Sequence, residues 1–282
     1  MEIKDFFKLI RIEQWYKNII IFVPLVFSLN LFNLSLFIKV ILGFISISFI
    51  SSSYYIINDL KDIEKDRNHT EKCKRPMASK KISKEFGIAV CIVLFLLSLI
   101  MALYLSRNFF YSIILLFLSS QLYTFLFRDI AFLDIIIIAV NFVIRAISGF
   151  LILNIPISYW ILLFAFFLSI FLVSGKRITE VNLRGLENYR PCLKKDHAKV
   201  FNLAIILSAN ALLILFSVYC IMFYPLLLLT LPISFYLLIL YFDNACNSPE
   251  KIRNPENFIF DKKILFTFLL WLVLVLIGLY FH

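Results

Sequence analysis

The sequence contains few charged residues and few of the residue types that build soluble catalytic or metal sites. Only 16% of its 282 residues are charged, and it has six glycines and three histidines. Zinc sites and disulfide frameworks depend on closely spaced cysteines. No C-x-x-C pair or other metal-ligand spacing occurs among the five cysteines, which are Cys73, Cys91, Cys192, Cys220 and Cys246. The sequence therefore supports neither kind of site.

Long polar stretches are also missing, which leaves no room for a soluble domain. Hydrophobic residues make up 62% of the chain, whereas soluble domains contain about 45–50%. Apolar stretches of about 20 residues, the length that a membrane-spanning helix requires, recur along the whole chain. Alternating segments of roughly ten residues, which are typical of membrane barrels, are absent. The sequence predicts an all-α polytopic membrane protein.

Nine membrane spans are expected, all within a single transmembrane domain over residues 1–282. They cover residues 18–32, 35–57, 86–105, 109–127, 131–150, 156–175, 199–222, 224–242 and 264–281. The first apolar stretch is short, so we expect its helix to be tilted or supported by its neighbours.

Basic residues gather in the loops on one side of the predicted bundle. When the connections are assigned alternately to two sides, one side holds 25 of the 28 lysines and arginines. That side comprises residues 1–17, 58–85, 128–130, 176–199 and 243–263. Cytoplasmic loops of membrane proteins carry such an excess, so this side is predicted to face the cytoplasm.

The net charge of +10 is consistent with this loop bias and with attraction to anionic lipid headgroups. Nucleic-acid binding is not expected, because the chain has no basic soluble domain to carry it. The membrane bundle itself must therefore contain the functional site.

An acidic cluster follows the second predicted span directly. The stretch NDLKDIEKD contains Asn58, Asp59, Asp62 and Asp66. If the helix continues through it, the first, third and fourth of these share one face at i, i+4 and i+8, with Asp59 beside them. Carboxylates packed this closely indicate a bound cation, and oxygen ligands suit Mg²⁺. The alternative is a solvated loop in which nearby cations neutralise the acids, namely Lys61, Lys65 and Arg67.

A basic strip, KCKRPMASKK, lies a few residues downstream of the acidic cluster. An acidic metal site beside basic residues suits a Mg²⁺–diphosphate, because the acids hold the metal and the cations hold phosphate oxygens. Lys74 and Arg75 are the candidate phosphate ligands. Ordinary cytoplasmic loop charge explains Lys80, Lys81 and Lys84.

These residues resemble the UbiA-type superfamily of intramembrane prenyltransferases. Its first aspartate-rich motif, NDxxDxxxD, is matched by Asn58, Asp59, Asp62 and Asp66, and a family-like K-R-P follows at residues 74–76. The resemblance implies a nine-helix bundle with a central cavity that opens to lipid and is capped by cytoplasmic loops.

The segment after the sixth span departs from that superfamily. The resemblance implies a second aspartate-rich motif here, for another Mg²⁺ on an isoprenoid diphosphate. The sequence instead reads SGKRITE, with Lys176, Arg177 and Glu180. Together with QWYKN near the N-terminus, this departure makes the chain similar to the polyprenyl-phosphate phosphoribosyltransferase branch, which includes the decaprenyl-phosphate phosphoribosyltransferases.

Other polar residues have both a functional and a structural interpretation. Arg145 lies within the fifth span, where an arginine is costly unless paired or hydrated, so it binds phosphate or pairs with Asp134 or another acid. Asn141 precedes Arg145 by one helical turn and could line the same wall of the site. Lys17 either contacts phosphate or extends to the lipid headgroups, and Tyr123 either lines the wall or hydrogen-bonds the sugar.

The branch resemblance implies Mg²⁺-dependent transfer of 5-phosphoribosyl from 5-phosphoribosyl 1-diphosphate to a polyprenyl phosphate, in the bacterial cytoplasmic membrane. Two alternatives stay open: a prenyltransferase with an aromatic acceptor, and a transporter. The metal ligands expected are Asn58, Asp59, Asp62 and Asp66. The catalytic residues expected are Asp59, Asp62, Asp66, Lys176 and Arg177. The substrate-binding residues expected are Lys17, Asn58, Lys74, Arg75, Tyr123, Asn141, Arg145, Lys176, Arg177 and Glu180.

Overall fold

The computed structural model describes residues 2–68, 72–182, 196–247, 252 and 261–281, and the regular elements in these ranges are all helical. This confirms the predicted fold class. The chain divides into two compact units. Unit 1 comprises Met1–Leu126 and Ile144–Ile157, and unit 2 comprises Phe127–Val143 and Ser158–His282. The expectation of one domain over residues 1–282 stays a prediction.

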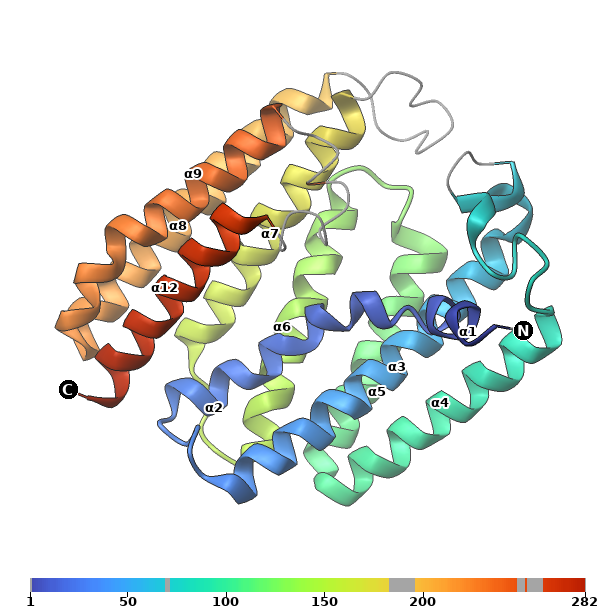
Figure 1. The fold of residues 1–282 in the computed structure, drawn as a ribbon, viewed down its shortest axis with the longest axis horizontal. Helices are drawn as coiled ribbons and strands as arrows, with labels where there is room; N and C mark the ends of the chain where they lie inside the picture. Colours follow the sequence, from blue (N-terminus) through green and yellow to red (C-terminus); the bar gives the residue numbers. More distant parts are fainter. Residues whose placement is uncertain (1, 69–71, 183–195, 248–251, 253–260, 282) are drawn as a thin grey trace. The chain divides into compact units, whose positions relative to one another are not determined.

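Unit 1 is built around one long helix, α3 (Leu34–Arg67), which runs antiparallel to α4 (Lys84–Leu105) (Figure 1). The other elements of this unit are shorter. They are α1 (Ile3–Leu9), the 3₁₀ helix η1 (Ile12–Phe22), α2 (Val23–Phe27), the 3₁₀ turn η2 (Lys72–Lys74), α5 (Arg107–Leu122) with the π-helix η3 (Tyr123–Phe127) at its end, and the C-terminal half of α6 (Leu133–Leu153).

Unit 2 contains the N-terminal half of α6 and a group of long helices. They are α7 (Tyr159–Asn182), α8 (His197–Phe223), η5 (Pro225–Thr230) with α9 (Leu231–Asn247), and α12 (Lys262–Tyr280). Helix α7 packs along α8, and α9 contacts both α8 and α12 (Figure 1). Residues 183–195 of the predicted connection after α7, including Cys192, lie outside the described residues.

Eight helical segments in the described part of the chain are long and apolar enough to cross a membrane, and they coincide with predicted spans two to nine. The structure corrects the prediction of one continuous span over residues 18–32. Residues 18–22 belong to the 11-residue η1, residues 23–27 form the five-residue α2, and residues 28–32 are not helical. Pro24 cannot donate a backbone hydrogen bond, and Leu29 has a positive φ of 59° that α-helices do not contain. The segment therefore cannot form one continuous α-helix.

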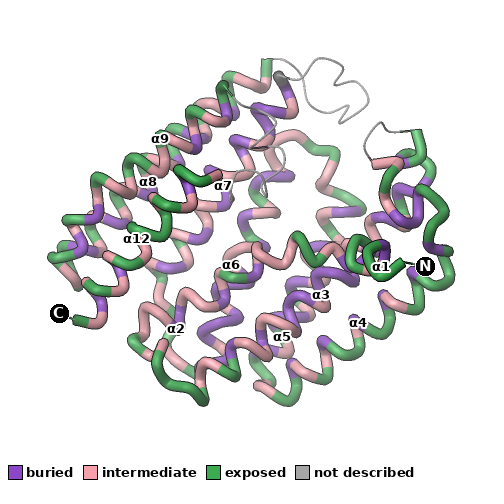
Figure 2. Tube along the Cα trace, in the orientation of Figure 1, coloured by how far each residue is buried: buried purple, intermediate pink, exposed green. Residues whose placement is uncertain are grey.

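The outward faces of the helices are apolar, as a lipid environment requires. In α4 the buried residues recur every three or four positions, at Gly87, Cys91, Leu94, Ser98 and Ala102. The remaining faces carry exposed aliphatic side chains, and the exposed residues of α4 run along its length in Figure 2. An apolar exposed face of this length would be unstable in water, so the helix is built to contact lipid.

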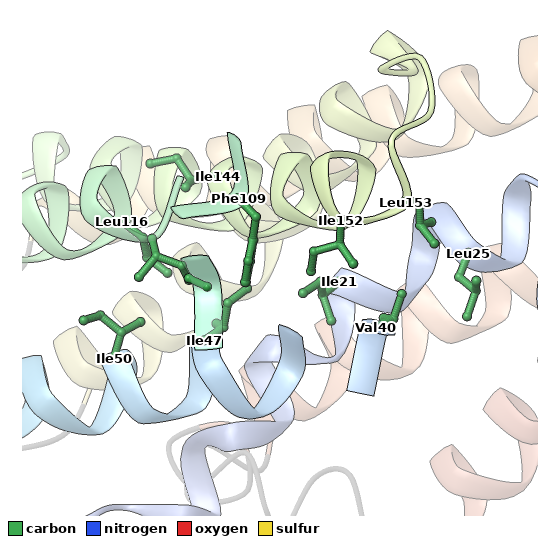
Figure 3. Packing of buried hydrophobic residues seen from close by; sticks show 12 residues of the cluster. Ile21, Leu25, Val40, Ile47, Ile50, Phe109, Leu116, Ile144, Ile152 and Leu153 are labelled. Atoms are coloured by element: carbon green, nitrogen blue, oxygen red, sulfur yellow. The ribbon is translucent and has the colours of Figure 1, made fainter. Parts of the chain in front are cut away.

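Unit 1 is held together by an apolar core and by serine hydrogen bonds between helices. The core joins residues of η1, α3, α5 and α6, among them Ile21, Ile47, Leu116 and Ile152 (Figure 3). Ser98 Oγ on α4 donates to the Ser46 carbonyl of α3 at 2.8 Å. Because small polar residues let helix backbones approach closely, these contacts fix α3 against α4.

Gly149 on α6 allows the closest backbone approach in unit 1 that a methyl group would obstruct. A Cβ added there would lie 2.4 Å from the Ile21 carbonyl oxygen and 2.9 Å from Pro24 Cγ. Neither atom belongs to a flexible side-chain end, so α6 would have to move away from η1 and α2.

We expect Gly149→Ala to reduce stability by about 1–3 kcal/mol, the usual effect of overpacking. The apparent Tm of purified protein in detergent measures this effect. Gly87→Ala is the matched control, because its new Cβ would meet only the flexible Met77 side chain, at 2.7 Å from Sδ. Equal Tm shifts in the two variants would contradict the prediction.

Candidate functional site

The acidic cluster lies on the C-terminal end of α3, because this 34-residue helix continues through Arg67 without a break. Asp59, Asp62 and Asp66 are only 4%, 4% and 3% exposed. Their i, i+3, i+7 spacing places all three on one helix face. The expected face centred on Asn58 is therefore shifted by one position, and Asn58 itself is half-buried.

Two arginines neutralise this acidic face. Arg75 Nη1 donates to Asp59 Oδ1 at 2.9 Å and to Asp66 Oδ2 at 2.6 Å. Arg11 Nη2 donates to the same Asp59 oxygen. Since one guanidinium nitrogen contacts both Asp59 and Asp66, these two carboxylates converge on a single cationic position.

Arg11 is held at a break in the helical backbone. It lies between α1 and η1 with φ 51° and ψ 51°, the left-handed region that costs a non-glycine residue about 1–3 kcal/mol. Its Cζ lies 4.9 Å from the centroid of the Tyr55 ring. Burial lowers the pKa of the guanidinium, and the Asp59 carboxylate and Tyr55 phenol raise it, so the pKa lies above its ordinary value.

The basic strip places only one of its two candidate cations on the acids. Arg75 follows η2 in a non-helical bend and is half-buried, whereas Lys74 is exposed. Met77 and Ala78 are buried immediately after it. The buried residues Pro76, Met77 and Ala78 thus anchor Arg75 beside α3, while Lys74 stays accessible to solvent.

A second polar cluster in unit 1 surrounds Arg145. This residue is 4% exposed. Its Nε donates to Asn18 Oδ1 at 2.9 Å, and its Nη2 donates to the Tyr54 hydroxyl at 2.6 Å. Asn18 in turn donates to Ser48 Oγ at 3.1 Å. The cluster therefore joins η1, α3 and α6 through a buried cation.

Lys17 and Tyr123 are both half-buried. Lys17 Nζ donates to Gln14 Oε1 at 2.6 Å and lies 5.8 Å from the centroid of the Tyr16 ring. Its neighbour Trp15 donates through Nε1 to Ser52 Oγ on α3 at 3.1 Å, which fixes this part of η1 against that helix. Tyr123 begins the π-helix η3.

In unit 2 an arginine bridges two acids. Arg177 Nε donates to Asp134 Oδ2 at 2.8 Å, and its Nη1 donates to Glu180 Oε2 at 2.7 Å. Asp134 is 1% exposed and Arg177 is 3% exposed. Lys176 is half-buried on the same helix, and Asn141 on α6 is buried. Arg177 thus joins α6 to α7 through ion pairs, and its binding of phosphate stays a prediction.

The donor set on α3 fits a divalent cation in chemistry and in charge. Carboxylate oxygens are the ligands that Mg²⁺ takes from proteins, and Asp59 and Asp66 already converge on one positive nitrogen. The arginines fill the positions between the acids. In the described residues no group of three or more His, Cys, Asp and Glu side chains forms a ready metal site.

The sequence did not identify Arg11, Asn18 or Tyr54 as site residues. Each makes its contact with a residue far away in sequence, 48 positions for Arg11 and Asp59 and 127 positions for Asn18 and Arg145. The only available signal for Arg11 and Asn18 was their position on either side of QWYK.

Comparison with known proteins identifies the family. A model of the UbiA prenyltransferase family matches residues 19–246. The chain belongs to the UbiA prenyltransferase family. It is therefore a multi-pass membrane transferase, and the resemblance of the NDxxDxxxD motif is confirmed.

Two curated relatives of this UbiA-family chain carry the same name, decaprenyl-phosphate phosphoribosyltransferase. The protein from Mycobacterium tuberculosis is 33% identical over 181 residues, which are 62% of this chain and 60% of the relative. The protein from Mycolicibacterium smegmatis is 31% identical over 219 residues, which are 75% of this chain and 69% of the relative. The chain thus spans less than two thirds of the first of these relatives.

The UbiA fold is also found among solved structures. A UbiA homologue from Archaeoglobus fulgidus bound to DMAPP and Mg²⁺ aligns with a TM-score of 0.73 over 98% of this chain and 99% of that chain. The two sequences are 18% identical, so this likeness supports the fold alone.

The ion pairs of Arg177 lead to a stability prediction. Arg177→Gln leaves the buried Asp134 carboxylate without this cation, which is expected to destabilise the protein by about 3–5 kcal/mol. The double variant Asp134→Asn with Arg177→Gln should recover a large part of the loss, because the fully buried carboxylate is then gone and the remaining acid, Glu180, is partly exposed. The apparent Tm in detergent measures both effects.

Lys199→Gln is the matched control for that experiment, since it removes an exposed cation of α8. It should leave the Tm unchanged. A double variant no more stable than the single Arg177→Gln variant would show that the charge pairing is not what Arg177 contributes.

Proposed function

We propose that this UbiA-family protein is a Mg²⁺-dependent polyprenyl-phosphate phosphoribosyltransferase. It transfers the 5-phosphoribosyl group of 5-phosphoribosyl 1-diphosphate to a polyprenyl phosphate and releases diphosphate. The names of the two mycobacterial relatives support this reaction.

One structural observation carries the choice between this reaction and ordinary prenyl transfer. Helix α3 gathers three buried aspartates on one face, whereas the described end of α7 carries a single acid, Glu180, beside Lys176 and Arg177. A second metal site for an isoprenoid diphosphate would require a pair of carboxylates at that end of α7. The fixed cation there favours a donor that needs only the acidic face of α3.

Asp59, Asp62 and Asp66, with Asn58, would hold the metal ion. Mg²⁺ bound there would neutralise the negative charge that builds up on the diphosphate leaving group.

The cations of the chain are assigned to phosphate oxygens. Arg75 and the exposed Lys74 would bind the diphosphate, because both adjoin the acidic face in the sequence and Arg75 contacts it directly. Lys17 and Arg145 would bind the remaining phosphates of the sugar and the lipid, with Tyr123 and Asn141 as hydrogen-bonding partners. Lys176 provides a further half-buried cation in unit 2, next to the Arg177–Glu180 pair.

The reaction requires no strong general base. The attacking group is an oxygen of the polyprenyl phosphate, which is already an anion. It forms a bond to C1 of the ribose while the bond from C1 to the diphosphate oxygen breaks, and the diphosphate leaves with the electron pair. Catalysis therefore depends on positioning and on charge stabilisation. This agrees with a chain that has only three histidines.

The bundle lies in the bacterial cytoplasmic membrane in this proposal. The loops with the excess of lysine and arginine face the cytoplasm, where the water-soluble sugar donor would reach the acidic face. The lipid acceptor enters from the bilayer, so neither substrate has to cross it.

We expect purified protein in nanodiscs to transfer label from radiolabelled 5-phosphoribosyl 1-diphosphate to decaprenyl or undecaprenyl phosphate when Mg²⁺ is present. Asp62→Asn should reduce this rate by about 10²–10³-fold, the effect of removing one charge-stabilising group. Chelation of Mg²⁺ by EDTA should abolish transfer, and added Mg²⁺ should restore it. Label in the lipid phase is the measurement.

Glu64→Gln is the matched control, because Glu64 is exposed on the same turns of α3 that bury the aspartates. Its rate should equal that of the wild type. A parallel assay supplies a polyprenyl diphosphate and 4-hydroxybenzoate. Product in that assay alone would assign the protein to aromatic prenyl transfer and overturn the proposed sugar donor.

A further inference from the structure

Arg11 belongs to no sequence motif considered above, yet it contacts the acidic face directly. Asp59 Oδ1 accepts hydrogen bonds from both Arg11 and Arg75. A carboxylate oxygen that binds two guanidinium groups is already fully occupied. A metal ligated by this oxygen of Asp59 would therefore compete with the two arginines for it.

We propose that Arg11 is a positioning residue with two binding partners. In the metal-free protein its guanidinium group pairs with Asp59 in place of the metal ion, and when Mg²⁺ and diphosphate bind it moves to the diphosphate oxygens. The proposal rests on the Mg²⁺–diphosphate part of the proposed function. It applies equally to a sugar diphosphate and to a prenyl diphosphate, and it assigns a new role to a residue outside the aspartate motif.

The charges of the exchange balance. Arg11 and Arg75 together contribute two positive charges to the acidic face, and Mg²⁺ contributes the same. Mg²⁺ coordinates carboxylate oxygens at about 2.0–2.1 Å, so guanidinium groups left on the same oxygen would be strongly repelled in a site shielded from water. Without either cation source, three buried carboxylates would repel one another. The arginines thus keep α3 stable until the metal arrives.

A displaced arginine beside a metal-bound diphosphate would find new acceptors at once. Guanidinium groups bind phosphate oxygens through paired hydrogen bonds. Arg11 would therefore weaken binding of Mg²⁺ alone and strengthen binding of Mg²⁺ with diphosphate. A purely structural arginine does not produce effects of opposite sign.

The backbone at Arg11 suits such an exchange. The residue occupies the non-helical junction between α1 and η1 and its side chain is half-buried, so a change of rotamer can turn it away from Asp59. Its guanidinium contacts Asp59 and the Tyr55 ring. Both contacts come from α3, the helix that carries the metal ligands.

The test measures two affinities by isothermal titration calorimetry in nanodiscs: Mg²⁺ alone, and inorganic diphosphate in the presence of saturating Mg²⁺. In Arg11→Gln we expect Mg²⁺ to bind about tenfold more tightly, because a charged competitor for Asp59 is gone. Diphosphate should bind about tenfold more weakly, because a charged ligand is lost. Arg11→Lys should lie between this variant and the wild type.

Lys8→Gln is the matched control, since it removes an exposed cation of α1 one turn before Arg11. Both of its affinities should equal those of the wild type. Changes of the same sign in Arg11→Gln, or no change in either affinity, would overturn the proposal.

A second measurement on the wild type covers the case in which Arg11→Gln does not fold. Phenylglyoxal labelling of Arg11, located by mass spectrometry, should rise with Mg²⁺ alone and fall with Mg²⁺ and diphosphate. Equal labelling in all three states would refute the exchange. Inorganic diphosphate carries no sugar and no prenyl group, so these results do not depend on which donor the transfer assay identifies.

Discussion

The pairing of buried carboxylates with arginines is the constraint on which this structure depends. A carboxylate removed from water is strongly destabilising unless a cation or several hydrogen bonds compensate for it. The acidic face of α3 buries three aspartates within three helical turns, and two of them contact Arg75. Because Arg11 and Arg75 lie on separate segments that meet at Asp59, the same ion pairs that neutralise the acids also hold α1, η1 and the basic strip against α3.

Helix α3 combines the two kinds of packing that this arrangement needs. Its apolar half carries buried serines, such as Ser46 and Ser53, whose hydroxyl groups bond to the backbone of α4 and allow close contact. Its polar half begins after Tyr55 and carries the aspartates. Since one unbroken helix contains both halves, the position of the acids is fixed by packing within the apolar core and does not rely on a loop.

The sequence predicted the features that depend on local pattern and missed those that depend on long-range contacts. The length of the hydrophobic stretches correctly predicted eight of the nine expected spans. The spacing of the aspartates correctly predicted that they share a helix face, but that face includes Asp59 where Asn58 was expected. The division of residues 18–32 into η1 and α2 was missed because overall hydrophobicity outweighed the effect of Pro24. The Arg145–Tyr54 contact joins residues 91 positions apart, and no local pattern encodes such a pairing.

The two units compensate their buried acids in physically different ways. In unit 2, Arg177 and Glu180 lie three positions apart on α7, so the helix itself holds the two side chains within reach of each other. In unit 1, Arg11 and Arg75 both reach the acids from non-helical positions, at the α1–η1 junction and in the bend after η2. Neighbours one turn apart on the same helix stay within reach of each other, whereas an arginine from a separate non-helical segment has no partner on its own helix to return to. If a divalent cation enters either cluster by displacing an arginine, it will enter at the acidic face of α3, where three buried aspartates share one helix face and can replace the lost ion pairs with metal ligation.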